Sequence, residues 1–185
     1  MFLEFLDNKK QLKNEKIIYG QHSTPFGECL IGVISDKIAH LSFINEEHCF
    51  ANIFSQFKNE WKHNELIEDK ILTKITIDKI FYSKNKSEMQ NLKLLLKGTH
   101  FQFEVWKTLL EIPEGTTLSY QEIAIKMRRP KSARAVAGQI AKNSIAYLIP
   151  CHRIIRKSGT LGGYRYGLKL KESLLKHEQT YATHS

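Results

Sequence analysis

The sequence is poor in cysteine and has no long apolar run. Three cysteines, Cys29, Cys49 and Cys151, lie far apart in a chain of 185 residues. An odd number at this spacing argues against a disulfide framework and for a reducing compartment, so we predict a cytoplasmic protein. No apolar run approaches the roughly 18 residues of a membrane span, and the N-terminal residues do not resemble a signal peptide. We therefore expect neither membrane insertion nor secretion.

Acidic residues are missing from one long stretch. Between Ile123 and Lys171 there is no Asp or Glu, although the chain carries 19 acids in total. Twelve of its 28 bases lie in this stretch, and they alone exceed the net charge of +9: Lys126, Arg128, Arg129, Lys131, Arg134, Lys142, Arg153, Arg156, Lys157, Arg165, Lys169 and Lys171. Such segregation is expected of a protein that binds a polyanion, and we predict nucleic acid. A solvated basic face without a ligand is the alternative.

The first half of the chain alternates strand-like and helical patterns. Residues 27–44 alternate apolar and polar side chains around a polar centre, which predicts a β-hairpin. Residues 46–61 place apolar side chains at helical spacing after two acids, which predicts an amphipathic helix with those acids in its first turn. The β-branched stretch 70–82 predicts a strand. We place a domain boundary near Gly98, giving domains 1–97 and 98–185.

The second half predicts short helices. Thr99 can cap a helix over 101–111. Ser119 and Glu122 have the spacing of a capping box, which predicts a helix from Ser119 to about Lys126. A third helix is expected from Ser132 onward, and two short helices joined by a tight turn resemble a helix-turn-helix.

The third predicted helix carries small residues around Arg134. Ala133, Ala135, Ala137 and Gly138 would let its backbone approach another surface closely. That surface is either a second helix or DNA, and the surrounding bases favour DNA.

Cys151 lies in the sequence LIPCHRIIRKSG, where chemistry is expected. A cysteine nucleophile acts as a thiolate, and nearby cations lower its pKa; Arg153, Arg156 and Lys157 would supply that field. His152 is adjacent in sequence, so direct contact with the thiol is difficult while contact through an ordered water is feasible. Cys29 and Cys49 lie in apolar patterns and are expected to be buried and inert.

The motifs around Cys151 resemble a known family. IPCHRII is similar to the active-site signature of the methylated-DNA–protein-cysteine methyltransferases, also called 6-O-alkylguanine-DNA alkyltransferases. The likeness extends over GTHFQFEVWKTLLEIPEGTTLSYQEIA, PKSARAVAGQIAKN and LIPCHRIIRKSGTLGGYRYGLKLKESLLKHE, from Gly98 to Glu178. It implies an α+β fold. The N-terminal part would be a ribonuclease-H-like α/β domain with a small antiparallel sheet, and the C-terminal part a mostly helical, winged-helix-like domain with a helix-turn-helix.

The resemblance also implies a reaction and catalytic roles. The protein would transfer the alkyl group of 6-O-alkylguanine, and of 4-O-methylthymine, irreversibly to Cys151, so that each molecule acts once. His152 would take the thiol proton through a water and Glu178 would orient the imidazole. Asn143 would hold the turn that carries the active-site loop. Tyr120 would press on the target phosphate and donate a proton toward the purine.

A DNA interface and a base pocket are implied in the same way. The target base would leave the duplex on the minor-groove side, and Arg134 would fill the vacancy. The residues expected to contact double-stranded DNA are Arg134, Tyr120, Ser132, Ala133, Ala135, Gly138, Lys142 and Arg153. The pocket would be formed by Ile154, Tyr164, Arg165, Gly162 and Gly163, with Tyr164 stacking on the base.

Cofactors and rival functions complete the expectations. No organic cofactor is expected, and Cys29, Cys49 and the scattered histidines lack the ligand spacing of a metal site. The protein is expected to be a monomer. Three alternatives are a DNA-binding regulator without chemistry, a lesion-flagging relative that lacks the cysteine, and a cysteine hydrolase. Cys151 argues against the lesion-flagging relative, while the basic charge and the adjacent histidine argue against the hydrolase.

Overall fold

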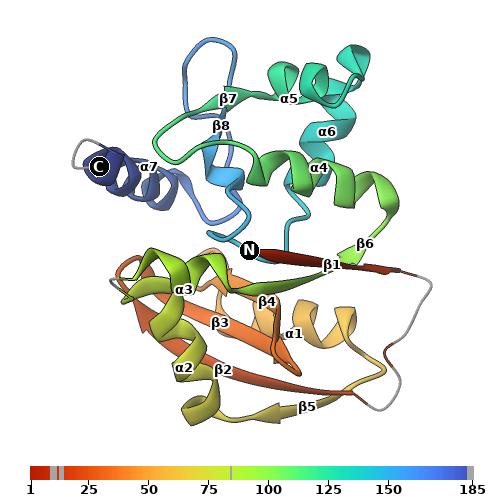
Figure 1. The fold of residues 1–185 in the computed structure, drawn as a ribbon, viewed down its shortest axis with the longest axis vertical. Helices are drawn as coiled ribbons and strands as arrows, with labels where there is room; N and C mark the ends of the chain where they lie inside the picture. Colours follow the sequence, from red (N-terminus) through yellow and green to blue (C-terminus); the bar gives the residue numbers. More distant parts are fainter. Residues whose placement is uncertain (9–11, 13–14, 84, 183–185) are drawn as a thin grey trace. The chain divides into compact units, whose positions relative to one another are not determined.

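The protein is α+β and forms two compact units (Figure 1). The computed structural model describes residues 1–8, 12, 15–83 and 85–182. One unit is Met1–Thr99 and the other is His100–Ser185, so the division falls two residues after the boundary expected from the sequence. Within the described residues no helix is long and apolar enough to cross a membrane.

The N-terminal unit contains a mixed sheet. The order of its six described strands is β1-β6-β4-β3-β2-β5. The pairs β2–β3 and β3–β4 are antiparallel, whereas β1–β6, β4–β6 and β2–β5 are parallel. The expectation of a small antiparallel sheet is therefore wrong, because parallel strands extend the sheet on both sides of the antiparallel strands β2, β3 and β4. The strands are β1 (Phe2–Asp7), β2 (Lys16–Thr24), β3 (Gly27–Ile34), β4 (Lys37–Phe43), β5 (Glu65–Glu68) and β6 (Lys93–Gly98).

The predicted hairpin is confirmed as β3 and β4, joined at Ser35 and Asp36. Helix α1 (Phe50–Glu60) covers one face of the sheet, where Phe57 is fully buried. A Cβ atom at Gly32 of β3 would lie 2.7 Å from the Phe57 ring. Glycine is therefore required where this helix crosses the strand.

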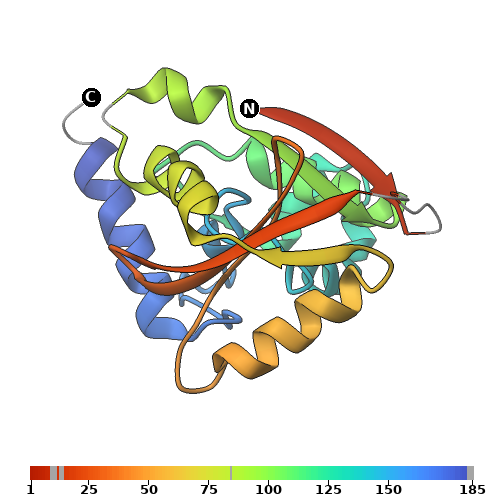
Figure 2. The same ribbon diagram turned by 90° about the horizontal axis from the view of Figure 1, so that it is seen from below.

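Helix α2 (Lys70–Phe81) corrects the strand expected over 70–82. Asp69 caps it, since its carboxylate accepts from the backbone N–H groups of Ile71 and Leu72, each at 2.9 Å. Thr73, Ile77 and Ile80 form its buried stripe at helical spacing. The helix packs on the sheet face opposite to α1 (Figure 2). A short helix, α3 (Lys86–Gln90), follows.

Two expectations about the start of α1 are also wrong. Glu46 and Glu47 precede the helix, so its first turn holds no acid. Cys49 is the N-cap residue and is exposed rather than buried. Cys29, in contrast, is buried in β3 as expected, and burial raises the pKa of its thiol to about 12.

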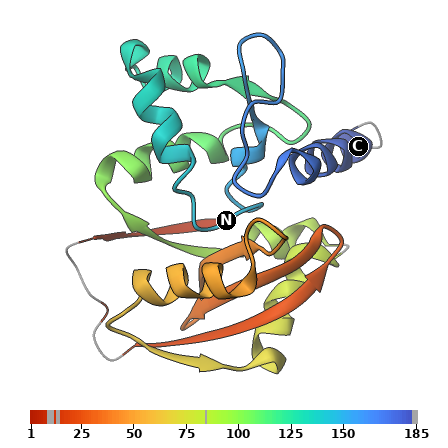
Figure 3. The same cartoon turned by 180° about the vertical axis from the view of Figure 1, so that it is seen from behind.

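The C-terminal unit is mostly helical. Its elements are α4 (His100–Leu110), β7 (Leu118–Ser119), α5 (Tyr120–Lys126), a 3₁₀ helix (Pro130–Ser132), α6 (Ala133–Ile140), a second 3₁₀ helix (Cys151–Arg153), β8 (Ile154–Ile155) and α7 (Leu168–Ala182). Helices α4, α5 and α6 form a cluster, and the chain between α6 and α7 separates α7 from it (Figure 3).

Local sequence signals set these helix ends. The Ser119–Glu122 capping box is confirmed: the Ser119 N–H donates to Glu122 Oε2 at 2.7 Å, and the Glu122 N–H donates to Ser119 Oγ at 3.2 Å. Helices α5 and α6 are joined by a turn in which Arg128 has a φ of 57°, followed by the 3₁₀ helix Pro130–Ser132. Trp106 of α4 is buried, and its Nε1 donates to the Gln139 carbonyl of α6 at 3.0 Å.

Candidate active site

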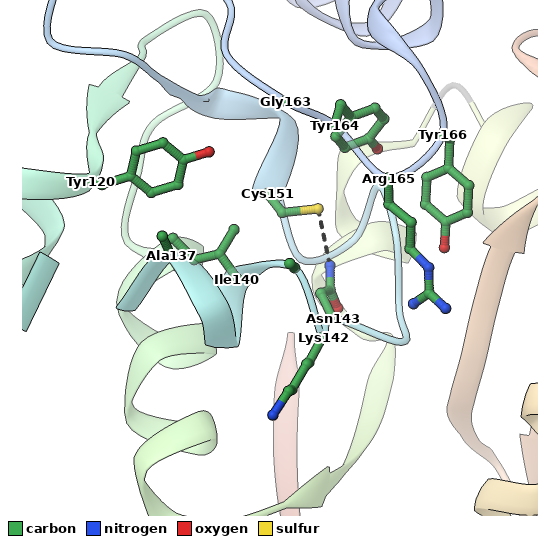
Figure 4. Close-up of a pocket in the computed structure, with 11 residues that line it drawn as sticks. Tyr120, Ala137, Ile140, Lys142, Asn143, Cys151, Gly163, Tyr164, Arg165 and Tyr166 are labelled. Carbon is green, nitrogen blue, oxygen red and sulfur yellow. Dashed lines mark hydrogen bonds between the residues drawn. The ribbon is translucent and has the colours of Figure 1, made fainter. Parts of the chain in front are cut away.

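Cys151 opens onto a cavity of about 650 Å³ in the C-terminal unit (Figure 4). The cavity lies between α5, α6, the start of the 3₁₀ helix at Cys151 and the loop before α7. Its lining residues are Tyr120, Ala137, Ile140, Ala141, Lys142, Asn143, Cys151, Gly163, Tyr164, Arg165 and Tyr166. The Cys151 sulfur therefore faces a space of the size that small-molecule sites have.

Asn143 fixes the chain around this sulfur. Its Oδ1 accepts from the Ile145 N–H at 2.9 Å, and its Nδ2 donates to the Ile149 carbonyl at 3.0 Å and to Cys151 Sγ at 3.3 Å (Figure 4). Asn143 is 3% exposed, so these bonds have no competition from water. One amide thus bonds to the backbone on both sides of the turn and also contacts the thiol.

The thiol is less acidic than the sequence suggested. Burial raises the pKa of Cys151, and the Asn143 hydrogen bond and the charge of Lys171 only partly oppose this. The expected field from Arg153, Arg156 and Lys157 is not what acts on the sulfur. The reason is that the cost of removing a thiolate from water exceeds the stabilisation it gains from cationic side chains that point into solvent or bind another partner.

Behind Cys151, three side chains form a buried ionic network. His152 Nε2 lies 2.6 Å from Glu178 Oε1, and the Arg153 guanidinium donates to both oxygens of Glu178 at 2.9–3.1 Å. Arg153 also donates to the Ile112 carbonyl at 2.6 Å. Although burial opposes ionisation of Glu178, hydrogen bonds from His152 and Arg153 hold its pKa at about 2. Burial lowers the pKa of His152, so a neutral imidazole faces an ionised carboxylate.

Lys171 of α7 is a buried cation that binds backbone. It is 0% exposed, and its Nζ donates to the carbonyls of Ile154 (2.5 Å), Leu161 and Gly163 (3.4 Å). Burial lowers the pKa of Lys171 to about 8. From the sequence, Lys171 is one of the twelve bases of the acid-free stretch and no individual role is predicted for it. Helical spacing could have predicted the burial of Lys171, because it lies on one buried stripe of α7 with Leu174, Leu175 and Glu178.

Comparison with known proteins identifies the family. Residues 100–180 match the family model described as 6-O-methylguanine DNA methyltransferase, DNA binding domain. A methylated-DNA–protein-cysteine methyltransferase of Kluyveromyces lactis is 52% identical over 84 residues, which is 45% of this chain and 44% of that protein. The protein of the same name from Methanosarcina barkeri is 36% identical over 156 residues, 84% of this chain and 93% of that protein. The chain belongs to the methylated-DNA–protein-cysteine methyltransferase family.

A solved structure of this methyltransferase family extends the likeness to the fold. The crystal structure of Mycobacterium tuberculosis OGT in complex with DNA superimposes with a TM-score of 0.66 at 28% identity, covering 88% of this chain and 93% of that one. The α+β expectation is thereby confirmed.

The expected pocket of the methyltransferase family is assembled only in part. Of the five residues expected in the pocket, Gly163, Tyr164 and Arg165 line the cavity beside Cys151. Tyr120 and Asn143, which were expected as catalytic residues, line it as well. Two expected pocket residues are not among the lining residues: Gly162, and Ile154, which is fully buried with its carbonyl bound by Lys171. Three further lining residues, Ala137, Ile140 and Ala141, are not predicted from the sequence, whereas Tyr166 belongs to the GGYRYG loop that is expected to form the pocket.

Tyrosine hydroxyls border the sulfur on two sides of the cavity. Burial, followed by the nearby Cys151, raises the pKa of Tyr120 and raises the pKa of Tyr164 well above its ordinary value. Both phenols are therefore protonated at neutral pH and available as hydrogen-bond donors. Tyr166 packs edge-on against Tyr164 with ring centroids 5.6 Å apart.

Helix α6 presents most of the residues expected to contact DNA. Arg134, Ala135 and Gly138 are exposed, and Ser132 and Ala133 are half-buried. A Cβ atom at Gly138 would meet nothing within 4 Å in the part of the chain that the structure describes. Intramolecular helix packing therefore does not explain the small residue at Gly138. Val136 and Ile140 face the core.

Arg153 departs from its expected role at the DNA surface. Its side chain is 15% exposed and its guanidinium is committed to Glu178 and the Ile112 carbonyl. Lys142, by contrast, is exposed and lines the cavity. Among the described residues, no group of three or more His, Cys, Asp or Glu side chains is arranged to hold a metal ion.

Proposed function

We propose that this protein repairs alkylated DNA by moving the alkyl group of 6-O-alkylguanine, and of 4-O-methylthymine, to Sγ of Cys151. The observation that carries the proposal is the placement of that sulfur on a cavity of about 650 Å³ in a chain of this family. In the step, the bond between the guanine oxygen and the alkyl carbon breaks as the sulfur–carbon bond forms. Because the thioether is not readily hydrolysed, each chain reacts once.

Thiol activation is assigned to the buried network. Nδ1 of His152 has no hydrogen-bond partner within the described residues, which leaves its lone pair available to accept the Cys151 proton through an ordered water. Glu178 would keep the imidazole in that tautomer and stabilise the imidazolium that forms. The leaving guanine would receive a proton from the Tyr120 hydroxyl.

DNA would be engaged through α6 with the target base extruded. The alkylated oxygen lies on the base-pairing edge, so the sulfur reaches it only after the nucleotide leaves the stack, which costs a few kcal/mol. Arg134 is exposed in the first turn of α6 and would occupy the vacancy. The exposed small residues Ala135 and Gly138 would allow this helix to approach the minor groove.

Further expectations belong to the same proposal. The antiparallel β2–β3–β4 meander, followed by β5 parallel to β2, supports the ribonuclease-H-like description of the N-terminal unit. The α5–α6 pair supports a helix-turn-helix in a winged-helix-like unit. Three free cysteines support a reducing, cytoplasmic setting. We propose a monomer that acts without a cofactor.

Mass spectrometry tests the reaction. Incubation with duplex DNA bearing one 6-O-methylguanine is expected to replace the Cys151 thiol hydrogen with one methyl group per chain. Cys151→Ala is expected to abolish transfer and retain DNA binding. Cys49→Ala, which removes the exposed cysteine of the N-terminal unit, is the matched control and is expected to react fully. Methylation elsewhere, or turnover beyond one equivalent, contradicts the proposal.

The finger role of Arg134 is tested separately. Arg134→Ala is expected to slow transfer from duplex DNA much more than transfer from the free methylated base, because only the duplex needs its stack filled. Lys131→Ala, which removes an exposed base from the preceding 3₁₀ helix, serves as the control for general charge. Equal losses on duplex and free base would remove the finger role.

A further inference from the structure

The short parallel ladder between β7 and β8 brings Arg156 beside Tyr120. Leu118 pairs with Ile154 and Ser119 pairs with Ile155. Strands β7 and β8 lie side by side (Figure 1). In parallel strands the next residues leave the ladder at the same end, so Tyr120 and Arg156 follow as neighbours. Tyr120 then begins α5 and lines the Cys151 cavity. The register therefore places an arginine next to the cavity, although the two segments are far apart in sequence.

Gly162 gives the Arg156 side chain its position. A Cβ atom at Gly162 would lie 3.2 Å from Cγ and 3.8 Å from Nε of Arg156, and Gly162 has a φ of +66°. The stem of the arginine therefore lies against the loop at Gly162. The next residue, Gly163, lines the cavity. The loop that contributes Gly163 to the cavity therefore also lies against the Arg156 side chain.

The Arg156 guanidinium is exposed and uncommitted. Within the described residues no hydrogen bond or ion pair engages it, in contrast to Arg153 on Glu178 and Arg129 on Glu104, the latter at 3.3 Å. Its charge reaches Tyr120: burial and Cys151 raise the pKa of that phenol, and Arg156 opposes them. An arginine guanidinium beside a phenol hydroxyl at the edge of a pocket offers an anion several hydrogen-bond donors and a positive charge.

We propose that Arg156, beside Tyr120, binds a phosphate that flanks the extruded nucleotide. A base inserted toward Cys151 leaves its sugar and phosphates at the edge of the cavity, where each phosphate carries one negative charge. The planar guanidinium matches two phosphate oxygens, and a lysine point charge does not reproduce that geometry. The assignment rests on the proposed function, because it needs a nucleotide in the cavity.

The test combines a side-chain change with neutralisation of one phosphate. Arg156→Gln and the adjacent control Lys157→Gln are compared in single-turnover transfer from duplex DNA carrying one 6-O-methylguanine. A hydrogen bond to a charged group is worth about 1.5–3 kcal/mol, so Arg156→Gln is expected to slow transfer at subsaturating protein about tenfold or more. Lys157→Gln is expected to change the rate less than about threefold, since a solvated charge contributes only screened attraction.

The decisive duplexes carry a neutral methylphosphonate on the 5′ or the 3′ side of the lesion. On one of these duplexes, transfer by the wild type is expected to slow to the rate of Arg156→Gln on natural DNA. Transfer by Arg156→Gln is expected to be no slower on that duplex than on natural DNA. Arg156→Lys is expected to recover only part of the rate. If the Arg156→Gln substitution slows transfer by the same factor on both neutral duplexes as on natural DNA, the contact is not to these phosphates and the proposal is overturned.

Failure of this inference is distinguishable from failure of the proposed function. Transfer from free 6-O-methylguanine base, read as methyl on Cys151, is expected to be equal within about twofold in the wild type and Arg156→Gln, because the free base has no phosphate to lose. Equal slowing on the free base would show that Arg156 supports the cavity rather than the phosphate. Absence of methyl on wild-type Cys151 with any substrate would overturn the proposed function itself.

Discussion

His152 and Glu178 are joined across 2.6 Å by a bond in which both side chains are almost completely buried, at 0% and 4% exposure. An ionised carboxylate only accepts, so Nε2 of the neutral imidazole is the donor and Nδ1 keeps its lone pair. The bond connects the segment next to Cys151 with the last helix of the chain. It therefore has consequences for both stability and reactivity.

The first prediction concerns Glu178→Gln. Removing this carboxylate leaves the buried Arg153 guanidinium without its counter-charge, and such losses cost about 3–5 kcal/mol of unfolding free energy. Urea denaturation at pH 7 measures the change. Glu172→Gln breaks an exposed pair with Lys176 on the same helix and is expected to cost no more than about 0.5 kcal/mol. Similar losses in the two variants would show that the buried network does not stabilise the fold.

The same carboxylate predicts an acid limit to stability. The folded-state pKa of Glu178 is about 2, below its ordinary value of 4.5. The stability it contributes is therefore fully present above pH 4.5 and is lost as the pH falls toward 2. Unfolding free energies of the wild type are expected to drop over this window. The unfolding free energy of Glu178→Gln should fall less over this window, because the variant has no carboxylate to protonate. If the difference in unfolding free energy between the wild type and the variant stays constant from pH 5 to pH 2.5, Glu178 does not cause the acid limit.

A third prediction concerns thiol reactivity in Asn143→Ala. The Asn143 amide donates to Cys151 Sγ and opposes the effect of burial, so its removal is expected to raise the pKa of the thiol further. Reaction of Cys151 with iodoacetamide at pH 7 should slow about tenfold, the value of one hydrogen bond to a charged group. Peptide mass spectrometry reports all three cysteines at once.

Cys49 and Cys29 provide the internal controls for that experiment. Exposed Cys49 should keep its rate, and buried Cys29 should stay unlabelled if the fold is intact. Rapid labelling of Cys29 would reveal unfolding rather than a local change. An unaltered rate at Cys151 with Cys29 protected would show that the amide does not tune the thiol.

The fourth prediction concerns the loop between β8 and α7. Lys171→Met removes the donor that the carbonyls of Ile154, Leu161 and Gly163 share. Hydrogen exchange should accelerate at the amides of Arg156 and Gly159, whose bonds to Thr160 and Arg156 close the loop. Lys169→Met alters an exposed lysine on the same helix and is expected to leave both amides protected. Equal protection in the two variants would show that the loop does not depend on Lys171.

Much of the local architecture could be predicted from the sequence. The hairpin at Ser35 and Asp36 and the capping box at Ser119 and Glu122 are signals within a few residues of one another, and both are confirmed. The strand expected over 70–82 failed because β-branched residues favour strands only on average. Here the Asp69 cap and the burial of Ile77 and Ile80 decided for a helix.

By itself, the sequence determined the family of this protein, and it predicted Cys151, in a basic region and in the PCHR motif, as the reactive centre. Only the tertiary structure decided what each charge does. It turned Arg153 inward onto Glu178, buried Lys171 against three carbonyls and left Arg156 exposed beside Tyr120. These outcomes depend on desolvation and on contacts between residues distant in the chain, and neither composition nor local spacing encodes them.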